Sequence, residues 1–177
     1  MKGRAVRIPC NETAPTAEVI WQKDLTPHPI HTTAVSKAMR RAHREGITVR
    51  MVEDFSDWHH SAGCLWHWQF PAKGESGEIY WQYALGHWAH FVAECDGQVV
   101  GTLGCYWWDG VATEVMSSIR PSARGLQVQE PLHVAVMDYA RQLGCHTFDL
   151  GGEGTPGIGN FKSKFGGTKT WVASAKL

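Results

Sequence analysis

Long apolar runs are missing from this sequence, and their absence excludes two classes of protein. No stretch approaches the roughly 20 apolar residues that a helix needs to cross a membrane. The opening residues, Met1 to Arg4, are not followed by an apolar segment of the kind found in secretory signals. We therefore expect neither a membrane-spanning protein nor a secreted one.

Cysteine pairs at metal-binding spacing are also missing. The five cysteines are scattered and odd in number, and none forms a C-x-x-C pair: Cys10, Cys64, Cys95, Cys105 and Cys145. Neither a zinc site nor a disulfide framework is indicated by this pattern. The sequence predicts a reduced, cytoplasmic protein with no bound metal.

An excess of charge of either sign is absent too. Seventeen Lys and Arg residues balance seventeen Asp and Glu residues, and the pI is about 7.1. This balance excludes a globally basic nucleic-acid binder, so any RNA contact must use a local patch. Two such patches exist, and each is either an RNA contact or an ordinary solvated face. The first holds Lys37, Arg40, Arg41 and Arg44 with His43, and the second holds Lys162, Lys164 and Lys169.

What is present indicates one globular domain with a substantial core. The chain has 177 residues, of which 43% are hydrophobic and 19% are charged. Nine residues are tryptophan, and seven of them lie between Trp58 and Trp108. These indole rings either line a groove for a ligand or form core and half-buried surface.

The periodicity of apolar residues predicts a mixed order of helices and strands. Residues 1–30 are proline-rich and are expected to form an irregular arm, with one strand at Ala17–Gln22, ahead of a single domain over residues 31–177. Helices are expected at Thr32–Glu45, capped by Ser36 or Thr33, and at Asp54–Trp68, Glu78–Ala89 and Val128–Leu143. Strands are expected at Ile47–Val52, Phe91–Cys95, Val99–Trp108, Val111–Ile119, His146–Leu150 and Thr168–Ala175.

The middle of the chain carries the clearest topological signal. Asp96-Gly97 and Asp109-Gly110 separate three strand-like runs, and Asp-Gly is a strong hairpin turn. The long helix at 128–143 then joins this antiparallel meander to a further strand. The order predicts an α+β fold, with a mostly antiparallel mixed sheet of about six or seven strands flanked by helices.

The C-terminal segment carries the strongest chemical signal. The predicted strand at His146–Leu150 ends in Gly151 and Gly152, a Gly/Pro loop follows at Glu153–Gly159, and two lysines then sit between two phenylalanines. Glycines directly after a strand leave backbone N–H groups approachable, as an oxyanion or phosphate site requires. The alternative is a tight connection with solvated lysines.

These motifs resemble the GNAT acyltransferase fold, and within it the Fem-type aminoacyltransferases. Asp96-Gly97 before Val99-Val100-Gly101 resembles a hairpin of the fold, and the run from Ile119 to Leu126 resembles the P-x-x-R-G acyl-CoA loop. The run from Gly144 to Gly167 resembles the Fem-type C-terminal motif, with its F-D-L-G-G and F-K-x-x-F-G-G elements. The run from Ser36 to Val49 resembles the helix and strand that open the Fem-type domain. Together these motifs cover roughly residues 33–172.

The resemblance implies transfer of an aminoacyl group from aminoacyl-tRNA to an amine, forming an amide. It places Lys162 at the tRNA 3′ phosphate and the oxyanion, with Lys164 nearby and Phe161 stacked on the terminal adenine or packed in the core. Arg124 and Gly125 in the loop, Gly151 and Gly152 in the turn, and Arg40, Arg41 and Arg44 in the first basic patch complete the predicted donor-binding set.

Two departures from the family pattern bear on the donor and the acceptor. Where acyl-CoA-dependent members continue with G-x-G or G-x-A, this chain has Gln127 and Gln129, followed by Glu130-Pro131. A carboxylate there opposes a pyrophosphate, which favours aminoacyl-tRNA over acyl-CoA. The Fem-type ligases also have two such domains and this chain has one, so we expect a small molecule or peptide as acceptor instead of a cell-wall precursor.

The proton carrier is left open by the sequence. Asp149 and Glu114 are the catalytic candidates beside Lys162, and Asp149 is either a base or a brace for the glycine turn. Glu153, His133 and His146 are further candidates, with His146 more typical of a structural residue, and Tyr139 is expected to pack. Three functions follow: an aminoacyl-tRNA-dependent transferase, an acyl-CoA N-acyltransferase, or a non-catalytic binding module. No cofactor beyond the co-substrate is expected, and the oligomeric state is left open.

Overall fold

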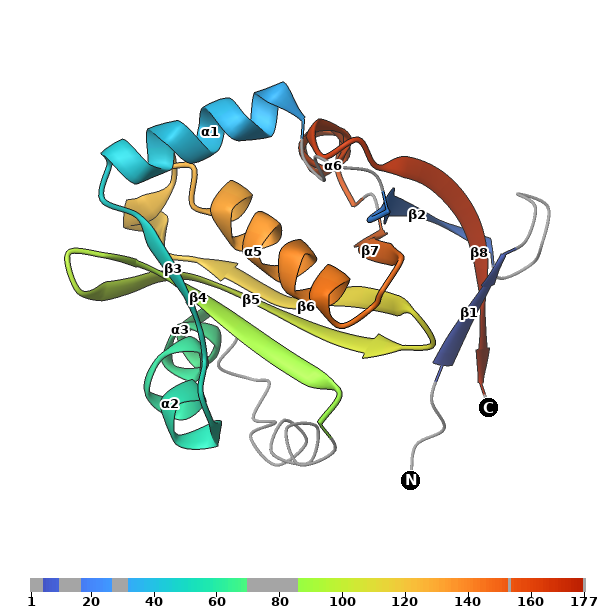
Figure 1. The fold of residues 1–177 in the computed structure, drawn as a ribbon, viewed down its shortest axis with the longest axis horizontal. Helices are drawn as coiled ribbons and strands as arrows, with labels where there is room; N and C mark the ends of the chain where they lie inside the picture. Colours follow the sequence, from blue (N-terminus) through green and yellow to red (C-terminus); the bar gives the residue numbers. More distant parts are fainter. Residues whose placement is uncertain (1–4, 10–16, 27–31, 70–85, 153, 177) are drawn as a thin grey trace.

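The computed structural model describes residues 5–9, 17–26, 32–69, 86–152 and 154–176. In these residues eight strands form one sheet, in the order β1-β8-β2-β7-β6-β5-β4-β3 (Figure 1). The strands are β1 (Ala5–Pro9), β2 (Ala17–Asp24), β3 (Thr48–Met51), β4 (Trp88–Cys95), β5 (Gln98–Trp108), β6 (Val111–Ile119), β7 (Thr147–Gly152) and β8 (Thr168–Lys176). Only β6 and β7 pair in parallel. The predicted α+β class with a mostly antiparallel mixed sheet is confirmed.

Two strands of this sheet, β1 and β2, lie within the first thirty residues, where an irregular arm with one strand was predicted. β2 confirms the strand expected at Ala17–Gln22, whereas β1 was not expected. β1 pairs with β8, and β2 lies between β7 and β8. These strands take the sheet beyond the predicted six or seven. Proline misled the prediction because Pro9 lies at the end of an edge strand, where a missing N–H group is tolerated.

The meander β4-β5-β6 matches the prediction closely because its turns are encoded locally. Asp96 and Gly97 have φ of 51° and 73°, and Asp109 and Gly110 have φ of 48° and 75°. Positive φ at both central residues defines the type I′ turn, whose twist matches that of the flanking strands. The two Asp-Gly pairs therefore fix both hairpins.

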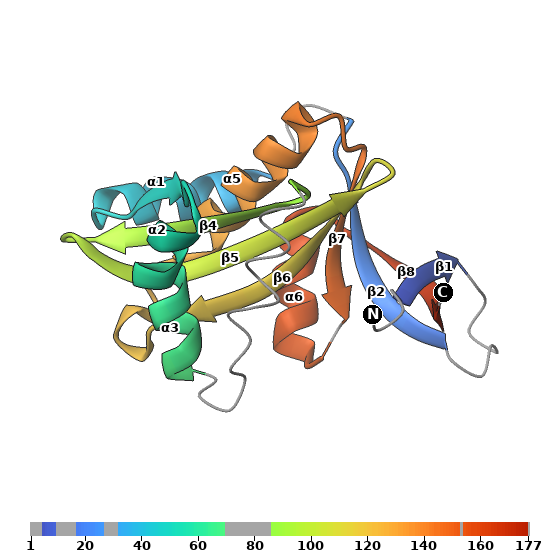
Figure 2. The same ribbon diagram turned by 90° about the horizontal axis from the view of Figure 1, so that it is seen from below.

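Helices cover both faces of the sheet (Figures 1 and 2). The helices are α1 (Thr33–Arg44), α2 (Phe55–His60), α3 (Ala62–Gln69), α5 (Gln129–Gln142) and α6 (Pro156–Lys164), with a short 3₁₀ turn η1 (Pro121–Ala123). α5 packs on β4 and β5 with α1 above it, whereas α2 and α3 lie on the opposite face against β4, β5 and β6. The segment expected as a loop or short helix after β7 thus contains a helix of nine residues.

Three helix boundaries differ from the prediction for local reasons. α1 is capped by Thr32, whose side chain accepts from the Val35 amide, and not by Ser36 or Thr33. The expected helix over Asp54–Trp68 is two helices, since α2 ends at Ser61. The expected helix at Glu78–Ala89 falls mostly outside the described residues, but its end is wrong, because Trp88 and Ala89 begin β4.

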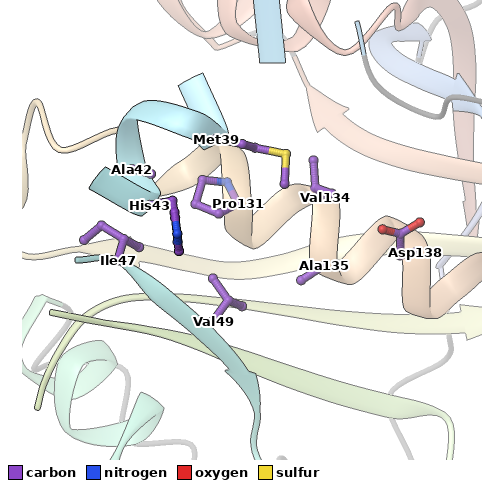
Figure 3. Close-up of a pocket in the computed structure, with 9 residues that line it drawn as sticks. All are labelled: Met39, Ala42, His43, Ile47, Val49, Pro131, Val134, Ala135 and Asp138. Atoms are coloured by element: carbon purple, nitrogen blue, oxygen red, sulfur yellow. The ribbon is translucent and has the colours of Figure 1, made fainter. Parts of the chain in front are cut away.

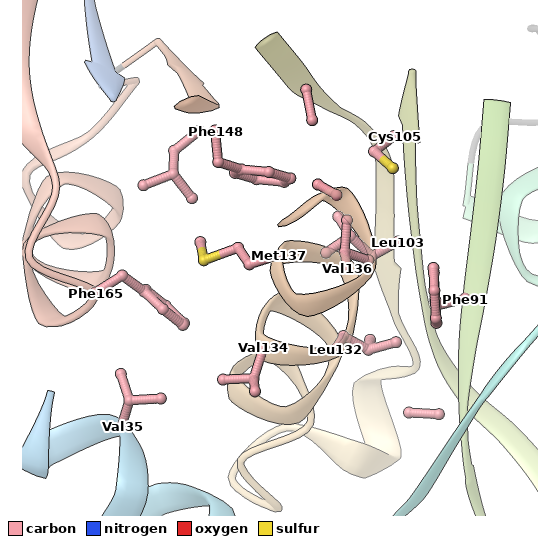
Figure 4. Packing of buried hydrophobic residues seen from close by; sticks show 14 of the residues in the cluster. Val35, Phe91, Leu103, Cys105, Leu132, Val134, Val136, Met137, Phe148 and Phe165 are labelled. Carbon is pink, nitrogen blue, oxygen red and sulfur yellow. The ribbon is translucent and has the colours of Figure 1, made fainter. Parts of the chain in front are cut away.

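The main core lies between α5 and the sheet, with contributions from α1 and α6 (Figure 4). Leu132, Val136 and Met137 of α5 are fully buried there, and Phe165 at the end of α6 joins them. A second cluster on the α2–α3 face is built around Trp58, whose indole N–H donates to His90 Nδ1 at 3.0 Å. Trp58 and Trp88 are therefore core residues, whereas Trp108 is 61% exposed.

Candidate active site

Strands β6 and β7 pair over only three residues and then separate. The pairs are Val111–Thr147, Ala112–Phe148 and Thr113–Asp149. Beyond them β6 continues to Ile119, while the end of β7 pairs with β2 instead. The candidate site lies where the two strands diverge, after this last pair. Glu114 is the next residue on β6, and Leu150 is the next residue on β7.

A β-bulge in β6 lies next to this separation. Val115 pairs with Gly104 and Ser118 pairs with Thr102, so β6 holds one residue more than β5 between the two pairs. Met116 has a φ of 53° at this point, which a non-glycine residue rarely adopts. Its side chain packs against the cluster around Trp58 on the opposite face. Bulges disrupt the ladder and occur often beside active sites.

Glu114 and His133 meet at the start of the separation. Glu114 Oε2 lies 3.2 Å from His133 Nε2, and His133 Nδ1 lies 2.8 Å from the Gln129 carbonyl oxygen. The His133 side chain is 2% exposed and that of Glu114 is 17% exposed. The sequence analysis named both residues as candidate general bases. The fold brings Glu114 of β6 and His133 of α5 together.

Two phenylalanines of the C-terminal motif enclose the His133 ring. The Phe161 ring lies edge-on to it at a centroid distance of 5.0 Å, and the Phe165 ring lies at 5.3 Å. Phe165 is fully buried and Phe161 is half-buried. Phe161 is thus packed against the core, although part of its ring remains accessible.

The glycine turn does not present bare amides, which corrects that expectation. Gly151 has a φ of 75°, and its amide donates to Asp149 Oδ1 at 2.7 Å. Gly152 lies in the β2–β7 ladder opposite Ile20, and its carbonyl oxygen accepts from Lys162 Nζ at 2.5 Å. Asp149 therefore braces the turn, as its alternative interpretation proposed, and the nearly buried Lys162 ties α6 to β7.

The loop before α5 holds the second group of predicted donor residues. Arg124 and Gly125 are exposed, and Gly125 has a φ of 100°. Glu130, in the first turn of α5, is 4% exposed, and its Oε1 lies 3.5 Å from Lys164 Nζ on α6. The first turn of α5 therefore carries a carboxylate that is already paired within the protein.

The arginines of the first basic patch stand apart from this site. Arg40, Arg41 and Arg44 are exposed, and Arg41 pairs with Glu45 at 2.9 Å. The start of α1 nevertheless contacts the end of α6, where the Thr32 hydroxyl donates to the Lys164 carbonyl oxygen. The α1 patch thus lies on a helix whose start contacts α6, which carries Lys162 and Lys164 of the second patch, whereas Lys169 lies on β8.

The remaining base candidates are placed elsewhere or are not described. His146 is exposed at the opposite end of β7, where its Nδ1 contacts the Thr147 hydroxyl at 3.0 Å. Tyr139 packs between Phe91 and Trp107, and burial raises the pKa of its phenol. Glu153 lies outside the described residues.

Two pockets lie away from the β6–β7 separation. One of about 340 Å³ is bordered by α1, β3 and α5 and is mostly apolar, with His43 and Asp138 at its edge (Figure 3). The other, of about 230 Å³, lies between the β4–β5 hairpin and η1. Neither is lined by Glu114, His133 or Lys162.

Within the described part of the chain, no group of three or more His, Cys, Asp or Glu side chains is arranged to hold a metal ion. The described helices also include none with the length and apolar character to span a bilayer.

Comparison with known proteins identifies the architecture. Residues 80–163, just under half of the chain, match the family model of the acetyltransferase (GNAT) domain. The chain has the GNAT fold. Its sequence matches no curated protein. The predicted resemblance to GNAT acyltransferases is thus confirmed, and the family match and the fold support acyl transfer as the chemistry.

Solved structures with the GNAT fold show the same arrangement at low identity. FemX has a TM-score of 0.69 and 12% identity over 90% of this chain and 61% of FemX. The C-terminal domain of an Agrobacterium fabrum protein assigned as a lysylphosphatidylglycerol synthetase has a TM-score of 0.66 and 18% identity, over 97% of this chain and 61% of that domain. L-PGS from Bacillus licheniformis has a TM-score of 0.63 and 14% identity, over 99% of this chain and 62% of L-PGS. The chain therefore spans about three fifths of these structures.

Sequence reasoning missed two pairings within this GNAT fold. It named His133 only as one of several bases, and it treated Glu130 as an unpaired carboxylate. A signal was present in the spacing of Gln129 and His133, four residues apart, which lets the His133 ring reach the carbonyl of the previous turn. Glu114, the partner of His133, lies on β6, and Lys164, the partner of Glu130, lies on α6. A local sequence pattern cannot predict contacts between separate elements.

Proposed function

We propose that this chain transfers an aminoacyl group from aminoacyl-tRNA to the amine of a small molecule or peptide and so forms an amide. The observation that carries the proposal is the buried Glu130 carboxylate in the first turn of α5, paired with Lys164. A helix N-terminus attracts anions through its free N–H groups and its dipole. Glu130 places a negative charge in this first turn, and a pyrophosphate brought to the same turn would be repelled.

The architecture of the relatives agrees with this choice of donor. FemX has the same fold, and the sequence motifs resemble the Fem-type aminoacyltransferases. The Agrobacterium protein is named for a product that carries a lysyl group. Because this chain spans only about 61% of each of these structures, its donor and acceptor are part of the proposal.

The chemistry needs positioning more than activation. The aminoacyl ester is already reactive, so the acceptor nitrogen attacks the ester carbonyl, the C–N bond forms and the C–O bond to the ribose breaks. Holding the two reactants together and stabilising the oxyanion supply much of the rate. The half-buried Phe161 ring offers a stacking face for the terminal adenine, and Lys164 offers a charge for the 3′ phosphate. Lys162 holds the turn beside them.

A transfer assay tests the proposal. The purified chain is incubated with total tRNA charged with radiolabelled amino acids and with a panel of free amino acids, dipeptides and diamines. We expect a labelled amide that resists alkaline ester hydrolysis and disappears when the tRNA is digested with ribonuclease beforehand. Product that survives ribonuclease, or no product with any charged tRNA, contradicts the proposed donor.

An acyl-CoA-dependent N-acyltransferase is the second candidate, favoured by the family model, which describes an acetyltransferase domain. The test is the melting temperature with increasing acetyl-CoA, since a ligand that binds the native state raises it. A saturable rise with turnover of the same amine panel supports this donor. An unchanged melting temperature, with no turnover across several acyl-CoAs, excludes it.

A further inference from the structure

The His133 ring contacts two oxygen atoms that accept hydrogen bonds. Its Nδ1 lies 2.8 Å from the Gln129 carbonyl oxygen and its Nε2 lies 3.2 Å from Glu114 Oε2. A neutral imidazole offers one donor and one acceptor, and a backbone carbonyl can only accept. Nδ1 therefore carries a proton, and a favourable contact on the other side needs a second proton between Nε2 and the carboxyl group.

The two partners differ in their access to the outside. The His133 ring is buried between Phe161 and Phe165, which fix its orientation. Glu114 is the outer member, at the first β6 position beyond the last pair with β7. Its second oxygen, Oε1, makes no hydrogen bond to any of the described residues. In this pair His133 is buried and fixed in orientation, whereas Glu114 has a second carboxylate oxygen at the strand separation.

We propose that His133 is a positioning residue, and that it holds Glu114 as the proton carrier of the reaction through a proton shared between Nε2 and Oε2. The inference rests on the acyl transfer proposed above. In this arrangement the shared proton lies between Nε2 and Oε2, and the other oxygen of Glu114, Oε1, is left for the reactants at the strand separation. The pair presents a base at a fixed angle, whichever donor supplies the acyl group.

The other ionisable groups around the pair are already engaged. On α5, Glu130 pairs with Lys164 of α6. On α6, Lys162 binds the Gly152 carbonyl oxygen, and on β7, Asp149 accepts from the Gly151 amide. Glu130 and Asp149 are also nearly buried, at 4% and 3% exposed, which leaves Glu114, at 17% exposed, as the most accessible of the three carboxylates.

The proton balance of the step is closed by this arrangement. As the acceptor nitrogen bonds to the carbonyl carbon, Glu114 Oε1 takes one of its protons. When the bond from carbon to the leaving oxygen breaks, the same proton passes to that oxygen. Glu114 returns to a carboxylate, and His133 keeps both of its protons throughout.

Nuclear magnetic resonance of ¹⁵N-histidine tests the shared proton without a substrate. The His133 signals are assigned by their loss in His133→Phe, a change that keeps an aromatic ring between Phe161 and Phe165. At pH 7 we expect the wild-type ring to carry protons on both nitrogens, and the Glu114→Gln ring to carry one, on Nδ1. A wild-type ring with a single proton, or a ring that is the same in both proteins, overturns the pairing.

A double-mutant cycle then tests whether the pair serves turnover. With the charged tRNA and amine panel, we expect Glu114→Gln and His133→Phe each to lower kcat by about 10²-fold or more with little change in KM. The double variant should lose no more than Glu114→Gln alone, because His133 acts only through Glu114. Losses that multiply contradict the proposal and indicate a separate, structural effect of His133.

Controls separate this inference from the proposed function. His59, exposed on α2 at the opposite face, is changed to Phe as a matched variant and should keep full turnover and the wild-type His133 signals. If no charged tRNA is a donor, the cycle is repeated with acetyl-CoA. Lack of turnover with either donor removes the proposed function and the catalytic use of the pair, while the resonance experiment still decides whether the proton is shared.

Discussion

At the scale of single residues, Lys162 has a structural role, because its side chain links α6 to the end of β7. Its side chain is nearly buried, and Nζ donates to the Gly152 carbonyl oxygen. Lys162→Met keeps the length of the side chain but leaves that oxygen without its charged donor. We expect the free energy of unfolding to fall by about 1.5–3 kcal/mol, measured by urea denaturation.

Lys164→Met is the matched comparison. Lys164 is 46% exposed and pairs with Glu130 at 3.5 Å, so the loss of stability should be smaller than for Lys162. Removing the Lys164 charge should instead raise the KM for charged tRNA. Equal stability of the two variants would show that the Gly152 contact contributes little.

His90 links stability to pH. Burial lowers the pKa of its imidazole from 6.5 to about 3, so the folded protein holds the ring neutral where the unfolded chain protonates it. Keeping the His90 ring neutral lowers the free energy of unfolding only below pH 6.5. This loss grows as the pH falls from there toward 3, by up to about 1.4 kcal/mol per pH unit. Between pH 6.5 and 3, the free energy of unfolding should depend less steeply on pH in His90→Gln than in the wild type. The Gln amide oxygen can still accept the hydrogen bond from Trp58.

A shallower acid slope in His90→Gln would identify that ring as the titrating group. The exposed His59 serves as control, and His59→Gln should retain the wild-type slope. If His90→Gln also retains it, the acid sensitivity of the fold arises from other side chains.

At the scale of secondary-structure elements, the seat of α5 on β5 depends on Gly101. A Cβ atom at this position would lie 2.5 Å from Val128 Cγ1 and 3.1 Å from Leu132 Cδ1. Gly101→Ala should therefore displace the start of α5 and lower the free energy of unfolding by about 1–3 kcal/mol. Because that start carries Glu130 and His133, turnover should fall as well.

Gly157→Ala is the contrasting change. Its Cβ would meet no atom closer than 3.8 Å, and alanine is the better helix former in α6. We expect a gain of roughly 0.5 kcal/mol in thermal or urea unfolding. A loss of the same size as for Gly101→Ala would mean that the clash at α5 is not the cause.

The elements also show which parts of the fold a sequence can predict. The meander was predicted correctly because Asp-Gly turns and alternating strands are local signals. β2 was predicted as a strand at Ala17–Gln22, but β1 and the pairing of both strands with β8 were not. Their partner lies at the other end of the chain, and a strand without its neighbour shows little beyond a short apolar run. α2 and α3 were merged because their apolar residues continue one helical pattern across Ser61, where the backbone turns.

At the scale of the whole molecule, the proposed tRNA donor predicts that the exposed arginines of α1 contact its phosphates. We expect Arg40→Gln with Arg44→Gln to weaken binding of charged tRNA and to lower the slope of log affinity against log salt by about two, one for each lost phosphate contact. Filter binding at several salt concentrations measures both quantities.

The same change of net charge on the opposite face is the control. His59→Glu with His60→Glu alters two exposed residues of α2 and should leave the slope at its wild-type value. An unchanged slope in the arginine variant would place the tRNA backbone elsewhere on the surface.

The candidate site as a whole was only partly predictable. The C-terminal motif drew attention to Lys162, Asp149 and the glycines, and the fold does bring them together. Their contacts were not predictable, because the Lys162 ammonium reaches the Gly152 carbonyl by way of the α6 turn, and no motif encodes that reach. The Glu114–His133 contact joins β6 to α5 over nineteen positions and exists only once both elements pack on the sheet.

The place of β2 between β7 and β8 sets an order of assembly during synthesis. Ile20 pairs with Gly152 on one side and Thr170 on the other, so β2 leaves the ribosome long before either neighbour exists. Until then both of its edges stay open, and such distant pairings form slowly. The nascent chain must therefore keep β2 unpaired or shielded until β8 is made, and a chain halted before β8 would present an open strand edge for aggregation.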